Sequence, residues 1–323
     1  MKLHEDTDLF KDAVSITAQH LKLPEIYVEK DYWVTFALYQ IFTSPVANVT
    51  VFKGGTALAK CFSVISRFSE DIDLVVLHSP DDTANQLKQR LKQVTQVVAD
   101  MMPEVEQIGL TNKKGMIRKT AHAYTRAFDG QFGQVRDLII LEVSWLGSAE
   151  PCTTSTVSSF VYDMMQASGQ QQLAADYGLL PFTVSVLDPT RTFCEKIMSL
   201  VRFSYTQTPL DDLRQKIRHV YDLHQLLQQD NIASFVNSAD FDLMLRKVAA
   251  DDRISFRSNN AWLKHHPSEA LIFADVVNVW RELRAIYHGT FKTLVFGTLP
   301  ADDQILTTLQ MLKSRLALVD WKA

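Results

Sequence analysis

The sequence predicts an α+β fold, in which an N-terminal part with a sheet and flanking helices precedes an all-helical C-terminal part. Short runs rich in β-branched residues alternate with helical patterns in the first part of the chain. After Asp188-Pro189, apolar residues recur at helical spacing. This dipeptide is a strong helix start, because Asp caps free N–H groups and proline has no N–H to lose. We therefore predict two domains, residues 1–187 and 188–323.

The elements follow from the same patterns. Helical spacing separates Leu9, Phe10, Ala13, Val14, Thr17 and Leu21, and Pro24 can open a second helix. In order, the N-terminal part is expected to hold helices at about 9–21 and 24–42, a strand at 49–53, a Gly-Gly turn at 54–55, a helix at 56–65, a strand at 71–77, a helix at 82–101, several strands within 105–145 and a Ser/Thr-rich loop at 151–159. The C-terminal part is expected to hold helices at about 189–204, 211–229, 239–249, 268–287 and 301–318.

Composition excludes several classes of protein. With 323 residues, the chain can form a core without a disulfide or metal. Its three cysteines lie far apart and form no CxxC pair, so neither a disulfide framework nor a zinc cluster is expected. The formal net charge of −4 means that any polynucleotide must bind to a local basic patch. The polar N-terminus suits no signal peptide and no apolar run is long enough for a bilayer, so we expect a cytoplasmic protein without membrane contact.

Asp71 and Asp73 are the first candidate site residues. Successive side chains of a strand point to opposite faces, so these two carboxylates project together and Ile72 packs into the core. Two adjacent carboxylates repel each other and are usually held by a divalent cation such as Mg²⁺ or Mn²⁺. The alternative is an acidic strand end that only blocks a sheet edge.

Gly54, Gly55 and Thr56 form the second candidate feature. A strand, a glycine turn and a helix start can bind phosphate, because glycine lets backbone N–H groups approach an anion and the helix N-terminus adds partial positive charge. The pattern is not the GxxxxGK[ST] phosphate loop. A plain tight turn is the alternative, but the Asp-X-Asp strand that follows makes the combination specific.

These motifs resemble a known family. The strings FKGGTAL (52–58) and RFSEDIDL (67–74) are similar to the polymerase-β-like nucleotidyltransferase superfamily, and within it to the AbiEii/AbiGii toxins of AbiE-type (type IV) toxin–antitoxin and phage abortive-infection systems. The string VEKDYW (28–33) resembles that family's N-terminal helix. The resemblance covers most of the chain in order. It implies a mixed sheet with flanking helices, an all-α C-terminal domain, and metal-dependent nucleotidyl transfer from an NTP.

The resemblance also implies roles for further residues. Glu142, an acid within an apolar strand, is the candidate third metal ligand, or else lies on a solvated face. Lys196 lies on or beside an apolar helix stripe and is expected to contact the triphosphate, with a snorkelling surface lysine as the alternative. Asp222 is expected to orient Lys196 or the base, unless it only pairs with Arg218. The C-terminal domain would thus contribute Lys196 and Asp222 to the site.

Other polar residues receive weaker predictions. Lys53 and Ser69 are assigned to nucleotide binding, as is Arg67, for which a buried Arg–Asp brace is the alternative. A basic cluster with Tyr124 among its members either grips an RNA backbone, with the ring stacked on a base, or is a solvated hairpin. Its charged members are Lys113, Lys114, Arg118, Lys119 and Arg126.

The expected function is that of a toxin. The resemblance implies that the acceptor is the 3′ end of a tRNA, which would block translation, and that a cognate antitoxin exists. One alternative is the same chemistry on a protein or small-molecule hydroxyl. The other is a non-catalytic nucleotide-binding module that acts through a partner.

Overall fold

The computed structural model describes residues 1–130 and 135–322. The chain divides into two compact units, and the main division falls between Leu187 and Asp188. The second unit also includes two short segments, 64–67 and 146–151.

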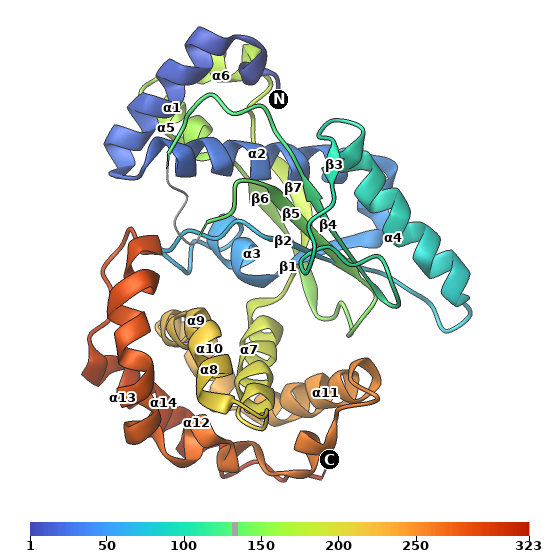
Figure 1. The fold of residues 1–323 in the computed structure, drawn as a ribbon, viewed down its shortest axis with the longest axis vertical. Coiled ribbons are helices and arrows are strands. Elements are labelled where there is room, and N and C mark those ends of the chain that lie inside the picture. Colours follow the sequence, from blue (N-terminus) through green and yellow to red (C-terminus); the bar gives the residue numbers. More distant parts are fainter. Residues whose placement is uncertain (131–134, 323) are drawn as a thin grey trace. The chain divides into compact units, whose positions relative to one another are not determined.

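The first unit is built on a mixed sheet (Figure 1). In the described part of the chain this sheet has seven strands, in the order β3 (Glu104–Val105), β4 (Ile117–His122), β5 (Ile139–Ser144), β2 (Ile72–Val76), β1 (Thr50–Lys53), β7 (Phe182–Leu187) and β6 (Cys152–Val157). The pairs β2–β5 and β1–β7 are parallel, and the other neighbours are antiparallel. The mixed sheet with flanking helices confirms the predicted fold class.

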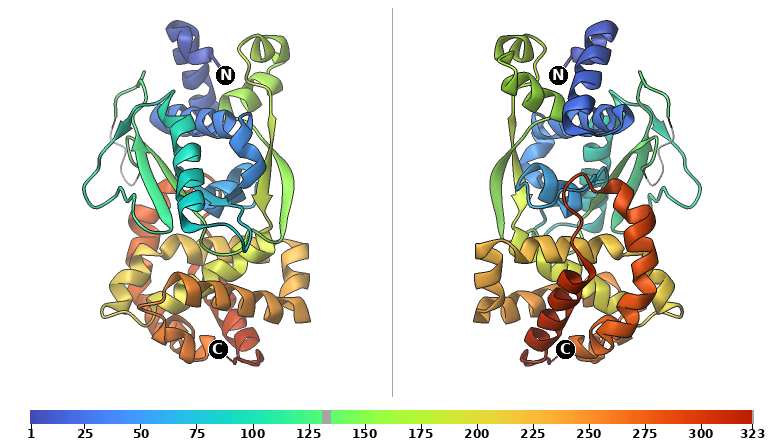
Figure 2. Two further views of the ribbon diagram at one scale, coloured as in Figure 1. Left: turned by 90° about the vertical axis from the view of Figure 1, so that its right-hand side faces the viewer. Right: turned by 90° about the vertical axis from the view of Figure 1, so that its left-hand side faces the viewer.

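The helices of the first unit are α1 (Thr7–Leu21), α2 (Glu25–Phe42), α3 (Gly54–Lys60), α4 (Ala84–Ala99), α5 (Phe160–Ala167) and α6 (Gln171–Asp176), with short 3₁₀ turns at Leu3–Glu5 and Pro45–Val49. Among these helices, α2, α3 and α4 pack against the sheet, whereas α1 and α5 pack on α2, and α6 packs on α5. Ile72, Leu74 and Val76 of β2 are buried in one cluster with apolar residues of α2 and α4. Helix α2 packs against α1, α4 and α5, and Figure 2 shows α1 and α5 side by side. The alternation of β2 therefore leaves Asp73 on the opposite face.

The second unit is helical in its long segment. It contains α7 (Pro189–Phe203), α8 (Pro209–Gln215), α9 (Ile217–Leu227), α10 (Asp230–Val236), α11 (Ala239–Ser255), α12 (Leu271–Ala274), α13 (Val276–Ile286) and α14 (Asp302–Leu316). Short helical turns occur at Ala261–Lys264, Pro267–Glu269, Tyr287–Phe291 and Lys292–Leu294. Helix α7 packs against α9 and α11, while α14 packs against α9, α12 and α13. The Asp188 side chain accepts a hydrogen bond from the Thr190 N–H, which confirms the predicted cap.

Several predicted elements were wrong. Gly54 and Gly55 form the first turn of α3, and this helix ends at Lys60 rather than near residue 65. The Ser/Thr-rich segment predicted as a loop is β6, an edge strand paired with the unpredicted β7. Its side chains are mostly exposed, so the apolar alternation that marks a half-buried strand is missing. The single helix predicted over 211–229 is α8 and α9, separated at Lys216.

No helix among the residues described here is long and apolar enough to cross a membrane.

Candidate functional site

Four charged residues form a row across the polar face of the sheet. In the strand register, Asp73 of β2 lies opposite Lys53 of β1 on one side and Glu142 of β5 on the other. Glu142 in turn lies opposite Lys119 of β4. Paired residues of neighbouring strands project from the same face. The sheet therefore places two carboxylates next to each other between two lysines.

Gly54 lies directly against this row. Its backbone has a φ of +82°, a conformation that L side chains rarely adopt. A Cβ atom at this position would overlap the Oδ2 of Asp73. Only glycine therefore satisfies both the backbone geometry and the close approach, and the predicted glycine and Asp-X-Asp motifs meet at one point.

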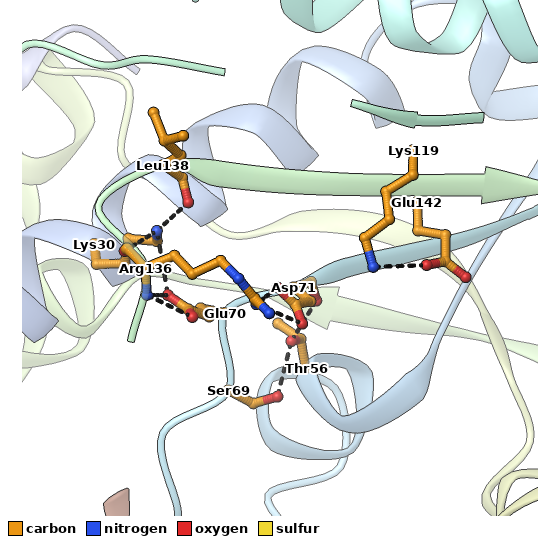
Figure 3. A network of polar contacts seen from close by, with 9 residues as sticks. All are labelled: Lys30, Thr56, Ser69, Glu70, Asp71, Lys119, Arg136, Leu138 and Glu142. Carbon is orange, nitrogen blue, oxygen red and sulfur yellow. Dashed lines mark hydrogen bonds and ion pairs between the residues drawn. The ribbon is translucent and has the colours of Figure 1, made fainter. Parts of the chain in front are cut away.

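Asp71 precedes β2 and is fixed through its main chain. The buried hydroxyl of Thr56 donates to the Asp71 carbonyl at 2.6 Å and lies 3.0 Å from the Ser69 hydroxyl. The Thr56 side chain thus joins α3 to the segment before β2. The Asp71 carboxylate contacts Arg136, whose Nη1 lies 3.2 Å from Oδ1 (Figure 3).

Neighbouring carboxylates affect the ionisation of Asp73. Burial, together with the negative charges of Glu142 and Asp71, raises the pKa of Asp73 to about 7. Lys53 and Lys119 oppose this shift but do not cancel it. A carboxylate whose ionised form is disfavoured by burial and by neighbouring negative charge suits a divalent cation, which would stabilise that charged form. The donor set therefore fits Mg²⁺ or Mn²⁺ held by Asp71 and Asp73.

Glu142 is already engaged. Its carboxylate accepts from the Lys119 ammonium at 3.0 Å, in a pair separate from the one at Asp71 (Figure 3). Across residues 1–130 and 135–322, no three or more His, Cys, Asp or Glu side chains are grouped so as to hold a metal ion. A two-carboxylate site remains chemically reasonable, because Mg²⁺ is often bound by one or two carboxylates together with substrate phosphates. The role of Glu142 as a third ligand stays a prediction.

Sequence reasoning missed a buried ion pair behind Asp71. The Lys30 ammonium lies 3.2 Å from the Glu70 carboxylate, and both side chains are buried. Lys30 also donates to the carbonyls of Arg136 and Leu138, while Glu70 accepts from the Arg136 N–H at 2.9 Å. The sequence signal was the charged run Glu29-Lys30-Asp31 inside an otherwise apolar helix, and the structure buries every residue of α2 from Ile26 to Leu38.

Lys196, Asp222 and Arg67 form a second cluster, inside the second unit. Arg67 donates to both oxygens of Asp222 at 2.7 Å, and the Lys196 ammonium lies 2.8 Å from Oδ2. All three side chains are buried. Burial alone would raise the pKa of Asp222, but the charges of Arg67 and Lys196 hold it below its usual value. Of the two alternatives for Arg67, the structure shows the buried Arg–Asp brace.

The basic cluster is largely paired with acids. Arg118 contacts Thr95 and Glu104, and Lys119 contacts Glu142. Tyr124 packs against Trp33 with ring centroids 5.6 Å apart. The hydroxyl of Tyr124 is buried, so this ring contributes to the packing of α2, which does not favour base stacking.

Comparison with known proteins assigns this fold to a class of enzyme. Residues 37–308 match the family model for the nucleotidyl transferase AbiEii toxin of type IV toxin–antitoxin systems. The chain therefore belongs to this family of nucleotidyltransferase toxins. No curated protein gives a significant match. Among solved structures, MenT4, a nucleotidyltransferase toxin from Mycobacterium tuberculosis H37Rv, is similar at 18% identity with a TM-score of 0.47, over 95% of this chain and 98% of that one.

Proposed function

We propose that this toxin transfers a nucleotidyl group from an NTP to the 3′ end of a tRNA, with a divalent cation held by Asp71 and Asp73. The supporting observation is the meeting of the Gly54 backbone, Asp73 and Glu142 on one face of the sheet. Family membership supports the NTP substrate and an antitoxin partner.

The residues of the first unit have distinct tasks in this proposal. Because Gly54 and Gly55 carry no side chain, the triphosphate can lie against the first turn of α3 beside Asp73. Thr56 acts through its hydrogen bond to the Asp71 carbonyl, which fixes the main chain from which the Asp71 carboxylate projects. When bound, the cation would offset charge on the α-phosphate and lower the pKa of the attacking hydroxyl.

The nucleotide-binding roles predicted for Lys196 and Asp222 remain proposals. Within the second unit, Asp222 holds the Lys196 ammonium at 2.8 Å, as expected of a residue that orients this lysine. A lysine held by a carboxylate keeps its positive charge and two further N–H donors, which a phosphate oxygen could accept.

The test is to incubate the protein with each α-³²P-labelled NTP, Mg²⁺ and a mixture of total tRNA and cell extract. We expect label in tRNA and an added nucleotide at its 3′ end on sequencing. Asp73→Asn should lower incorporation by at least about 100-fold, because metal charge stabilisation contributes several kcal/mol to such reactions.

Asp82→Asn is the matched control, because this aspartate is paired with Arg90 instead of belonging to the row. Label confined to protein or small molecules would reject the tRNA acceptor. Equal incorporation by Asp73→Asn and wild type would reject the proposed site.

A further inference from the structure

Arg136 is anchored at both polar groups of its main chain. Its carbonyl accepts from Lys30 at 2.6 Å, and its N–H donates to Glu70 at 2.9 Å. Lys30 is 0% exposed and Glu70 is 3% exposed, and their charged groups lie 3.2 Å apart. Separating two buried charges is strongly destabilising, so Lys30 and Glu70 stay in place. Because both are hydrogen-bonded to the main chain of Arg136, they hold that main chain in place as well.

The side chain of Arg136 is held far less tightly. It is 44% exposed and reaches Asp71 through Nη1, at 3.2 Å to Oδ1 and 3.5 Å to Oδ2. Charge-assisted hydrogen bonds are usually about 2.7–2.9 Å long, so this contact is a weak one. Among the residues described, the contacts of this guanidinium run through Nη1. Arginine presents five N–H donors in a planar fork that matches phosphate oxygens.

The charges of this face explain what such a group could do. The carboxylates are those of Asp71, Asp73 and Glu142. The accompanying cations are Lys53, Lys119 and Arg136. A divalent cation on the two aspartates would replace Arg136 as the partner of Asp71. A triphosphate then brings more negative charge than one divalent cation offsets. Lys119 already pairs with Glu142 at 3.0 Å, whereas Arg136 is half-exposed and only weakly bound to Asp71. Arg136 is therefore the better placed of these two cations to bind the added negative charge.

We propose that Arg136 is a triphosphate-binding residue. Its guanidinium leaves Asp71 and binds phosphate oxygens of the incoming NTP, while Lys30 and Glu70 keep its main chain fixed (Figure 3). The inference rests on the proposed function, because it places the triphosphate beside Asp71.

The test is calorimetric titration of the full chain with inorganic tripolyphosphate and Mg²⁺, a probe that carries no base. Arg136→Ala should weaken binding about 10- to 100-fold, the range expected for lost hydrogen bonds to a charged group. Arg136→Lys keeps the charge but loses the fork, so its affinity should lie between the two. Arg90→Ala is the matched control, because it removes another partly exposed arginine paired with an aspartate and should bind as wild type does.

The titration results separate the role of Arg136 from the proposed function. Equal binding by Arg136→Ala and wild type, with both proteins melting at the same temperature, would overturn the inference. Tighter binding by Arg136→Ala would also overturn it, because Arg136 would then only compete with the cation for Asp71. If Asp73→Asn loses binding and Arg136→Ala does not, only the role of Arg136 fails. If wild type binds no tripolyphosphate and transfers no nucleotide, the proposed function fails as well.

Discussion

Replacing Asp222 by asparagine should strongly destabilise the second unit. The substitution keeps the shape of the side chain but removes the negative charge that Asp222 presents to Arg67 and Lys196. The exposed fractions are 0% for Asp222, 3% for Arg67 and 8% for Lys196, so solvent cannot replace the lost partner. Breaking a buried ion pair on one side costs about 3–5 kcal/mol. With about 2–4 °C per kcal/mol for domains of this size, we expect the melting temperature to fall by roughly 10 °C.

The measurement is thermal unfolding of wild type and Asp222→Asn at pH 7, followed by circular dichroism. Asp320→Asn is the matched control, because its pair with Lys322 is mostly exposed and should contribute within about 1 kcal/mol. Replacing Asp222, Arg67 and Lys196 together by Leu, Met and Met should recover much of the loss, since no charge is then left unpaired. An Asp222→Asn protein that melts within 2 °C of wild type, on the order of 1 kcal/mol or less, would refute the reasoning.

Three further predictions concern the first unit. Gly54→Ala should destabilise the fold by about 1–3 kcal/mol and abolish nucleotide transfer, because the added Cβ is strained and overlaps Asp73; denaturant unfolding and the labelling assay measure both. Thr56→Val should cost about 1–3 kcal/mol in the same unfolding assay by removing the donor to the Asp71 carbonyl. Mn²⁺ affinity, measured by electron paramagnetic resonance, should rise with pH. At pH 6 it should be about tenfold lower than at high pH, because Asp73 has a pKa of about 7 and is mostly protonated at pH 6. Glu142→Gln should move this pH dependence to lower pH, because the negative charge of Glu142 helps to raise the pKa of Asp73.

Controls separate the causes in these experiments. Gly115 has a positive φ like that of Gly54, but a Cβ added there would have no neighbour within 4 Å. A greater loss of stability in Gly54→Ala than in Gly115→Ala therefore measures the overlap with Asp73. Thr43→Val removes an exposed hydroxyl-to-carbonyl bond and should cost less than Thr56→Val. Equal losses within either pair, or Mn²⁺ affinity that does not change between pH 6 and 8, would contradict the corresponding prediction.

Local patterns were sufficient for much of the fold. Apolar periodicity located α1, α2 and α7, and the Asp188-Pro189 start was confirmed because a capping side chain acts within one helical turn. The same reasoning failed for β6, whose exposed Ser and Thr side chains are stabilised by pairing with β7. A strand of this kind is recognised by its partner, and the partner lies more than 20 residues away in the chain, at Phe182–Leu187.

The sequence by itself determined the family, the glycine and Asp-X-Asp motifs, and the face on which Asp73 projects, because these depend on spacing along one segment. The tertiary structure decided which charges meet. Strand register placed Glu142 beside Asp73, and Arg67 was directed to Asp222, 155 positions later in the chain. Ion pairs and register are set by packing between distant segments, and that packing depends on the free energy of the whole core instead of any local residue pattern.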